Sequence, residues 1–216
     1  MKNEKIKISF KWDSAEHTCA HAYLMPAVLR ILEPLKPRKI FDLGCGNGSV
    51  ANALTQKGYR VVGVDPSPDG IRHARKAYPH LKLYPGSAYD PLARKYGRFP
   101  VVMSLEVVEH VFLPRSYAQT LFDLLEPGGT AIVSTPFHGY WKNLAIALTG
   151  GFDKHVNPLW DYGHIKFWSM KTLSTLLTEA GFEKDIHYRH VGRIPGLAKS
   201  MVAVAKKPLI SGPKRK

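Results

Sequence analysis

Three glycines with the spacing Asp42-x-Gly44-x-Gly46-x-Gly48 follow a short apolar run and precede a helix-forming segment. Because glycine reaches positive φ, this spacing predicts a sharp strand-to-helix turn that lets a ligand approach the backbone. The helix N-terminus offers N–H groups to a polar ligand, and the Asp42 carboxylate accepts hydrogen bonds from an amine or hydroxyl. The dinucleotide fingerprint has a third small residue where this chain has Ser49, which disfavours an NAD-dependent dehydrogenase. A turn that merely connects two elements is the alternative.

A second acidic residue ends the next predicted strand, residues 59–65. Asp65 follows Asp42 by 23 residues (65 − 42). In Rossmann-type folds, an acid about 20 residues after the glycine turn binds the ribose hydroxyls of the ligand. Asp65 is therefore the candidate for that contact, and the alternative is a turn residue before Pro66.

Two glutamates and a histidine follow a later apolar strand, with Glu106, Glu109 and His110 at positions i, i+3 and i+4. If this segment is a helical turn, the three side chains share one face. Carboxylates this close repel one another unless a cation lies among them, and carboxylate-rich ligation suits a hard ion such as Mg²⁺. The alternative is that the acids only favour a helix N-terminus while His110 packs or forms a hydrogen bond.

The order of these motifs resembles that of the class I S-adenosylmethionine-dependent methyltransferases over residues 36–207. The resemblance implies an α/β chain with the Rossmann-like class I methyltransferase fold. Its sheet would be mostly parallel and seven-stranded, with helices on both faces and a final antiparallel hairpin. The implied cofactor is S-adenosylmethionine, with the glycine turn around its amino-acid end. The implied cofactor-binding residues are Asp42, Gly44, Cys45, Gly46, Gly48, Asp65, Pro66, Ser67, Ser87, Ala88 and Leu105.

The Glu-x-x-Glu-His segment is similar to that of the ubiquinone-pathway O-methyltransferases and of the small-RNA 3′-terminal 2′-O-methyltransferases. In both families the acids and the histidine are associated with a divalent ion and with a histidine from a later insertion. The implied ligands of Mg²⁺ or another divalent cation are Glu106, Glu109, His110 and His164, with His138 and His155 in reserve. An ion lowers the pKa of a bound hydroxyl, after which a histidine takes the proton. The implied catalytic histidines are His110, His138 and His164, and the sequence does not choose the base.

The chain divides into an N-terminal arm with a pre-core helix (residues 1–35), a methyltransferase domain (36–207) and a basic tail (208–216). The apolar periodicity of residues 15–35 predicts a helix, and Pro26 within it predicts a kink or two shorter helices. Later segments alternate between strand and helix patterns. The further expected elements are helices over 69–78, 116–125 and 171–180, strands over 81–84, 101–104 and 131–134, a tight turn over 126–130, and a hairpin over 182–191 and 200–205.

Residues 137–168 form a long insertion after the fifth expected strand, where methyltransferases of this class build the acceptor pocket. Aromatic side chains at this density line a pocket for a flat or apolar acceptor, or dip into a membrane surface. His17, His21 and Tyr23 on the pre-core helix are candidates to close the acceptor site from the other side. The aromatic residues of the insertion are Phe137, Tyr140, Trp141, Phe152, Trp160, Tyr162, Phe167 and Trp168.

The composition is that of a soluble globular chain with a strongly basic balance. The formal net charge is +14 and the calculated pI is near 9.8. Such a surface attracts nucleic acid, anionic lipid or acidic small molecules, or serves solubility alone. Two cysteines give no disulfide framework, and no apolar signal core follows Met1. We therefore expect a cytoplasmic protein, with peripheral association at an anionic membrane surface as a further expectation.

The leading functional hypothesis is metal-assisted O-methylation of a small-molecule hydroxyl, aromatic or lipid-like, with S-adenosylmethionine as methyl donor. Ribose 2′-O-methylation of RNA is the alternative within the enzyme class, and it is favoured by the basic charge. No separate RNA-binding motif accompanies the domain, which makes nucleic acid the weaker partner. A non-catalytic scaffold that only binds the cofactor is the alternative from another class. The sequence leaves the oligomeric state open.

Overall fold

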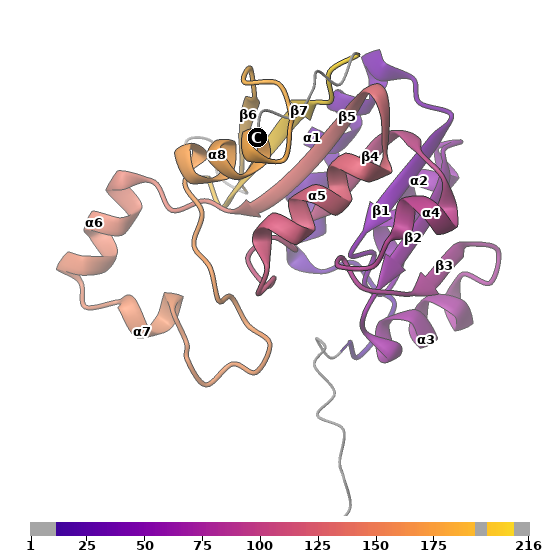
Figure 1. The fold of residues 1–216 in the computed structure, drawn as a ribbon. Helices are drawn as coiled ribbons and strands as arrows, with labels where there is room; N and C mark the ends of the chain where they lie inside the picture. Colours follow the sequence, from indigo (N-terminus) through magenta and orange to yellow (C-terminus); the bar gives the residue numbers. More distant parts are fainter. Residues whose placement is uncertain (1–11, 193–197, 210–216) are drawn as a thin grey trace, which may run out of the picture.

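The computed structural model describes residues 12–192 and 198–209, and it contains one sheet flanked by helices (Figure 1). Residues 1–11 of the expected N-terminal arm and residues 210–216 of the expected basic tail lie outside the described residues. The strands are β1 Lys39–Leu43, β2 Arg60–Asp65, β3 Lys82–Pro85, β4 Phe99–Leu105, β5 Leu125–Pro136, β6 His187–Val191 and β7 Ser200–Lys206. The helices are α1 Cys19–Leu35, α2 Ser49–Gln56, α3 Pro68–Ala77, α4 Leu92–Tyr96, α5 Pro114–Leu124, α6 Tyr140–Leu148, α7 Phe152–His155 and α8 Met170–Glu179.

The seven strands of the described chain are ordered β3-β2-β1-β4-β5-β7-β6. β1 pairs with β2 and β4 in parallel, whereas β7 is antiparallel to both β5 and β6. This confirms the predicted mostly parallel sheet and its final antiparallel hairpin. The strand order reverses between β1 and β4, and in open α/β sheets ligands bind outside the carboxyl ends of the strands at such a point.

Two hydrophobic cores lie on opposite faces of the sheet. One contains the inward-facing side chains of α4, α5 and α8, among them Leu121 and Leu177. The other contains those of α1, α2 and α3, among them Val28 and Leu54. Because both faces are covered, the central strands are apolar almost throughout, as parallel strands usually are. The layers thereby hold the carboxyl ends of β1, β2 and β4 at one edge.

Several local expectations differ from the structure. The first strand of the expected hairpin, over 182–191, is shorter, since β6 covers only His187–Val191. The predicted tight turn over 126–130 is a bulge inside β5, because Phe99 pairs with Leu125 while Val101 already pairs with Thr130. Pro100 lies at this irregularity and has no N–H to donate to the ladder. The pre-core helix begins at Cys19 rather than at residue 15 and runs past Pro26 to the end of its last turn.

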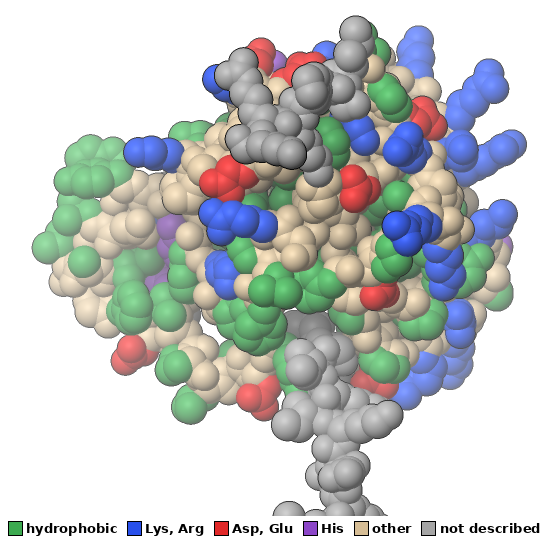
Figure 2. All heavy atoms as spheres, viewed as in Figure 1, with side chains coloured by type: hydrophobic (Ala, Val, Ile, Leu, Met, Phe, Trp, Pro, Cys, Tyr) green, Lys and Arg blue, Asp and Glu red, His purple; other side chains and the backbone are tan. Residues whose placement is uncertain are grey.

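The insertion forms an arm that projects from the carboxyl edge of the sheet and carries α6 and α7 (Figure 1). α6 has no buried residue, and Trp141 and Leu148 are each 78% exposed. Figure 2 shows apolar side chains gathered on this arm, at the left, while most Lys and Arg side chains of the visible face lie on the opposite side. The arm is therefore an apolar projection on a basic molecule.

Candidate active site

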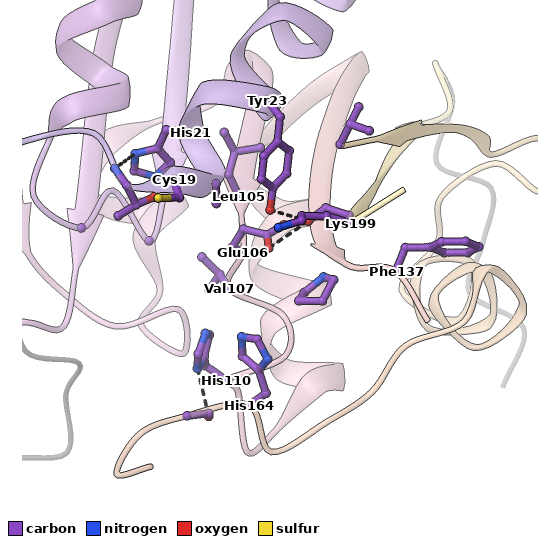
Figure 3. Close-up of a pocket in the computed structure, with 18 of the residues that line it drawn as sticks. Cys19, His21, Tyr23, Leu105, Glu106, Val107, His110, Phe137, His164 and Lys199 are labelled. Carbon is purple, nitrogen blue, oxygen red and sulfur yellow. Dashed lines mark hydrogen bonds between the residues drawn. The ribbon is translucent and has the colours of Figure 1, made fainter. Parts of the chain in front are cut away.

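A cavity of about 2600 Å³ extends from the carboxyl ends of β1, β2 and β4 to the insertion. α1 contributes Tyr23 to its wall, the segment after β4 contributes Glu106 and His110, and the insertion contributes His164 (Figure 3). Most of the residues that the sequence assigns to a cofactor and to a metal ion therefore face one continuous space, although Gly48, Ser67 and Glu109 do not line it. The volume is large enough for two small molecules side by side.

The glycine turn has the predicted conformation. Gly44, Gly46 and Gly48 have φ angles of 87°, 51° and 76°, which side chains with a Cβ rarely adopt. A side chain at Gly44 would also collide with Val107, and one at Gly46 would collide with the ring of Trp12. The turn therefore leaves open backbone where β1 ends and α2 begins.

Two buried carboxyl groups lie beside this turn. Asp42 is 2% exposed and its Oδ2 atom has no hydrogen-bond partner; burial and repulsion from Asp65 raise the pKa of Asp42 to about 8. Burial raises the pKa of Asp65 to about 6, although its carboxylate accepts hydrogen bonds of 2.8 Å from the backbone N–H groups of Gly46 and Ser67. An orphaned buried acceptor beside a second acid fits a ligand that brings an amine and hydroxyl groups. The site therefore suits S-adenosylmethionine.

The other predicted cofactor residues divide into two groups. Cys45, Pro66, Ser87, Ala88 and Leu105 line the cavity. Gly48 and Ser67 do not; Gly48 turns the backbone into α2, and the Ser67 hydroxyl caps α3 by accepting a hydrogen bond from the N–H of Gly70.

A segment that the sequence reasoning missed covers the turn. We call residues 12–18 the strap. The Asn47 amide donates hydrogen bonds to the carbonyl oxygens of Ser14 (2.9 Å) and Glu16 (2.8 Å), and the Tyr78 hydroxyl donates to Ala15 (2.9 Å). The ring of Trp12 packs against Gly46 and lines the cavity. The only sequence signal was an asparagine, a good donor, inside the glycine turn.

The imidazole of His21, on α1, is tied to the other end of the turn. The Nδ1 atom of His21 accepts a hydrogen bond from the Thr18 N–H (3.3 Å) and contacts the Ser49 hydroxyl (3.1 Å). Burial and the neighbouring His17 lower the pKa of His21 to about 4, so the ring is neutral at neutral pH. His21 and Tyr23 line the cavity, whereas His17 does not.

Glu109, His110 and His164 offer ligand atoms that all lie within 4.8 Å of one another. Glu109 is 1% exposed, and neither of its carboxylate oxygens has a hydrogen-bond partner; its Oε1 atom is 3.9 Å from His164 Nε2. Burial, and then repulsion from Glu106, raise the pKa of Glu109 well above its usual value. Two orphaned oxygens beside two imidazoles fit a divalent cation.

The backbone of the insertion orients these groups. His110 Nδ1 lies 2.9 Å and 3.0 Å from the carbonyl oxygens of Tyr162 and Gly163, so it carries the proton and the lone pair of the neutral ring is on Nε2. The left-handed φ of Tyr162, 62°, helps to aim these carbonyls. Burial lowers the pKa of His110 and, with His110 and His138 nearby, lowers that of His164 to about 4. Both rings are therefore neutral at neutral pH, the form that binds metals.

Glu106 lies outside this group of three. The residue has a left-handed φ of 55°, and the segment after it is a turn rather than the expected helix, so the i, i+3, i+4 face does not form. Its carboxylate accepts hydrogen bonds from the hydroxyls of Ser134 (2.8 Å) and Ser200 (3.2 Å), and the Ser200 hydroxyl is 3.3 Å from that of Tyr23. Figure 3 shows Glu106 directed toward Tyr23, away from His110 and His164. The structure thus brings together three of the four predicted ligands.

His138 and His155, the alternative candidates for the later histidine ligand, differ in whether they line the cavity. The His138 ring lies with Nδ1 3.2 Å from Asn143 Oδ1 and packs edge-on against Phe167, and it is not among the residues that line the cavity. His155 lines the cavity at α7. His138 is nevertheless near enough to His164 to lower its pKa.

The sheet order, the glycine turn and the two strand-end acids define the class of Rossmann-like methyltransferase folds. The model of the family described as "Methyltransferase domain" matches residues 16–187, and the chain belongs to that family. Among the part of the chain that is described, no helix combines the length and apolarity needed to cross a membrane.

A curated relative agrees with this assignment, and solved structures share the fold. The chain is 35% identical over 159 residues to the ubiquinone biosynthesis O-methyltransferase of Azorhizobium caulinodans, covering 71% of this chain and 62% of that protein. It thus spans less than two thirds of that relative's length. The fold is similar to that of the methyltransferase domain of bacterial CtHen1-C (TM-score 0.66, 20% identity, 88% of this chain and 99% of that one). The fold is also similar to that of human N-acetylserotonin methyltransferase, solved in complex with S-adenosylmethionine. The TM-score is 0.64 and the identity is 18%, and the match covers 85% of this chain and 51% of that one.

Proposed function

We propose that the protein transfers a methyl group from S-adenosylmethionine to a hydroxyl of a small molecule, with the help of a divalent cation. The observation that carries the proposal is the group of Glu109, His110 and His164. Its two histidines line the same cavity as the glycine turn. The relative in Azorhizobium caulinodans, named as a ubiquinone biosynthesis O-methyltransferase, supports oxygen as the acceptor atom.

Methyl transfer requires alignment and exclusion of water more than covalent help from the protein. S-adenosylmethionine supplies an electrophilic sulfonium methyl, and a divalent cation lowers the pKa of a hydroxyl that it touches. The methyl–sulfur bond breaks as the methyl–oxygen bond forms, and the hydroxyl proton leaves to a base. Asp42 and Asp65 hold the polar groups of the cofactor, and the aromatic side chains of the insertion exclude water. The proton acceptor would be one of the candidate histidines His110, His138 and His164, of which His110 and His164 line the cavity and His138 does not.

Calorimetry with Mn²⁺ and methylation assays with catechol test this proposal. We expect wild-type protein to bind one ion and to methylate catechol only in its presence. Glu109→Gln should lose both properties but retain S-adenosylhomocysteine binding, because Glu109 lies away from the glycine turn. Glu183→Gln, an exposed acid beyond α8, is the matched control. Full activity with chelator, or no ion bound by wild type, would contradict the role of the cation.

RNA ribose methylation remains the second candidate, favoured by the net charge of +14. Its ribose hydroxyl would use the same three-residue group. Methylation of a 3′-terminal RNA oligomer, with affinity that falls steeply with salt, would replace the small-molecule proposal. Binding of S-adenosylhomocysteine without turnover on any acceptor would favour a non-catalytic scaffold.

We also propose that the projecting arm of the insertion, which carries α6 and α7, rests on a lipid surface. Tyr140 and Trp141 are 72% and 78% exposed, and amphipathic aromatic rings are favourable at the interface between lipid and water. The test is flotation with phosphatidylglycerol vesicles. Trp141→Ser/Leu148→Ser should lose binding, whereas Phe112→Ser, which removes an exposed ring outside the arm, should retain it. Equal flotation of all variants would refute the proposal.

A further inference from the structure

Trp160 packs against both histidines of the three-residue group. It lies in the insertion between α7 and α8, lines the cavity and is 46% exposed. The centroid of its ring is 5.2 Å from that of His164 and 6.3 Å from that of His110, with interplanar angles of 56° and 90°. The two imidazole centroids are 4.9 Å apart. The three rings therefore form one cluster, in tilted and edge-to-face arrangements that are favourable for aromatic pairs.

The backbone fixes the place of Trp160 from both sides. Its N–H donates a hydrogen bond to the Asn157 carbonyl over 3.3 Å, and its carbonyl accepts one from the Gly163 N–H over 2.9 Å. The positive φ of Tyr162, 62°, suits the third residue of such a turn. A Cβ at Gly163 would lie 2.8 Å from two ring carbons of Trp160. Glycine at this position therefore lets the indole lie against the turn.

The two imidazoles differ in what else holds them. His110 Nδ1 lies within 3.0 Å of two backbone carbonyls of the turn. The His164 side chain makes no hydrogen bond within the described part of the chain, and its Nε2 atom is 3.9 Å from Glu109 Oε1, beyond hydrogen-bond distance. An imidazole turns about two side-chain bonds, so packing sets its orientation where no hydrogen bond does. Trp160 and His110 supply that packing for His164.

Packing against the main body of the protein does not explain the indole. Trp160 is not among the side chains that form or contact either hydrophobic core of the described chain. Trp168, by contrast, packs against one of these cores and donates a hydrogen bond of 3.1 Å to the Val108 carbonyl. The indole of Trp160 therefore serves its own neighbourhood, which is the histidine pair.

We propose that Trp160 is a positioning residue that holds the His164 imidazole beside that of His110, so that both rings belong to one ligand group with Glu109. The inference rests on the proposed function, because it names what orders the same ion-binding group. Groups around metal ligands that fix their orientation commonly change ion affinity by about tenfold or more when they are removed. Trp160 itself touches neither the cofactor turn nor the reacting atoms.

The test uses the full chain with Trp160→Leu, Trp160→Phe and the control Trp141→Leu. Trp141 is 78% exposed in the same insertion, and its ring packs against Tyr140 rather than against a histidine. In metal-free protein with isotope-labelled histidine, the nuclear Overhauser effect between the His110 and His164 ring protons reports their mutual position. Calorimetry then gives the Kd for Mn²⁺, and the Kd for S-adenosylhomocysteine confirms that each variant is folded.

We expect Trp160→Leu to lose the Overhauser effect and to raise the Kd for Mn²⁺ at least about tenfold. Trp160→Phe, which keeps an aromatic ring, should retain the Overhauser effect and bind Mn²⁺ within about threefold of wild type, the scale of one aromatic contact. Trp141→Leu should match wild type, and S-adenosylhomocysteine binding should be the same throughout.

Three results would overturn the inference: Trp160→Leu that keeps the Overhauser effect, Trp160→Phe that behaves as Trp160→Leu does, or Trp141→Leu that loses as much as Trp160→Leu. If wild type binds no Mn²⁺, the proposed role of the cation fails, and the Overhauser effect in metal-free protein still decides the inference. Its loss in Trp160→Leu alone would then support Trp160 as the residue that holds the two imidazoles together.

Discussion

Replacing Asp42 by Asn is expected to stabilise the ligand-free protein and to weaken its binding of the cofactor. In the folded protein the pKa of Asp42 is raised from 3.8 to about 8 by burial and by Asp65. The folded state therefore holds a proton that the unfolded chain releases at lower pH. The contribution of Asp42 to stability is undiminished below pH 3.8, falls as the pH rises toward 8, and is constant above it.

The size of the stability change follows from the difference between the pKa of Asp42 in the unfolded chain and its pKa in the folded protein. One pKa unit corresponds to about 1.4 kcal/mol, so between 3.8 and pH 7 the cost at Asp42 reaches at most about 4 kcal/mol. The asparagine amide keeps the shape but leaves a buried polar group to be satisfied, at about 1–3 kcal/mol. A net gain of about 1–3 kcal/mol remains, which raises Tm by about 2–10 °C in a chain of this size.

Thermal melts between pH 4 and pH 9 without ligand measure this gain. The difference in Tm between Asp42→Asn and wild type should grow with pH up to about 8 and then level off, whereas Asp161→Asn, at an exposed position, should show no such trend. In calorimetry, the Kd for S-adenosylhomocysteine should rise at least about tenfold for Asp42→Asn, since a charge-assisted hydrogen bond is lost. A Tm difference that does not depend on pH would refute the reasoning.

Three further changes test other parts of the site. Glu109→Gln replaces a carboxylate that has two unpartnered oxygens, so its Kd for Mn²⁺ in calorimetry should rise at least about tenfold; an unchanged Kd argues against the ion. The pKa of His21 is lowered from 6.5 to about 4, so the contribution of this ring to stability is fully present above pH 6.5 and falls by up to about 3 kcal/mol as the pH drops to 4. His21→Asn should lose most of this dependence in urea titrations, and an equally steep slope would contradict it. Trp12→Ala uncovers Gly46 and should raise the Kd for S-adenosylhomocysteine several-fold; the same Kd would show that the strap does not contribute to binding.

Much of the fold is readable from the sequence because parallel central strands are continuous apolar runs. The positions of β1 and β2 follow from such runs and from the acids at or next to their last residues, Asp42 and Asp65. The bulge in β5 was not predictable, since it depends on pairing with β4 and on a hydrogen bond from the Gly128 N–H to the Lys207 carbonyl, far along the chain.

The candidate site was predictable where one segment supplies the residues and not where distant segments meet. The glycine turn is local, and its three positive φ angles follow from residue type. Glu106 was grouped with Glu109 and His110 on helical periodicity, but Ser134 and Ser200, distant in sequence, bind its carboxylate instead. The strap shows the same limit, because its contact with Asn47 depends on tertiary structure.

The insertion is attached to the segment after β4, and this attachment is expected to couple acceptor selectivity to ion affinity. His110 is oriented by the carbonyl of Tyr162, 52 residues along the chain, and the Glu109 carbonyl accepts hydrogen bonds from the N–H groups of Ile165 and Lys166. The same insertion carries the exposed aromatic side chains. Grafting an insertion from another family member would therefore exchange the exposed aromatic side chains and one residue, His164, of the three-residue group in a single step. Variation of this segment, by design or by descent, is expected to alter selectivity and ion affinity together.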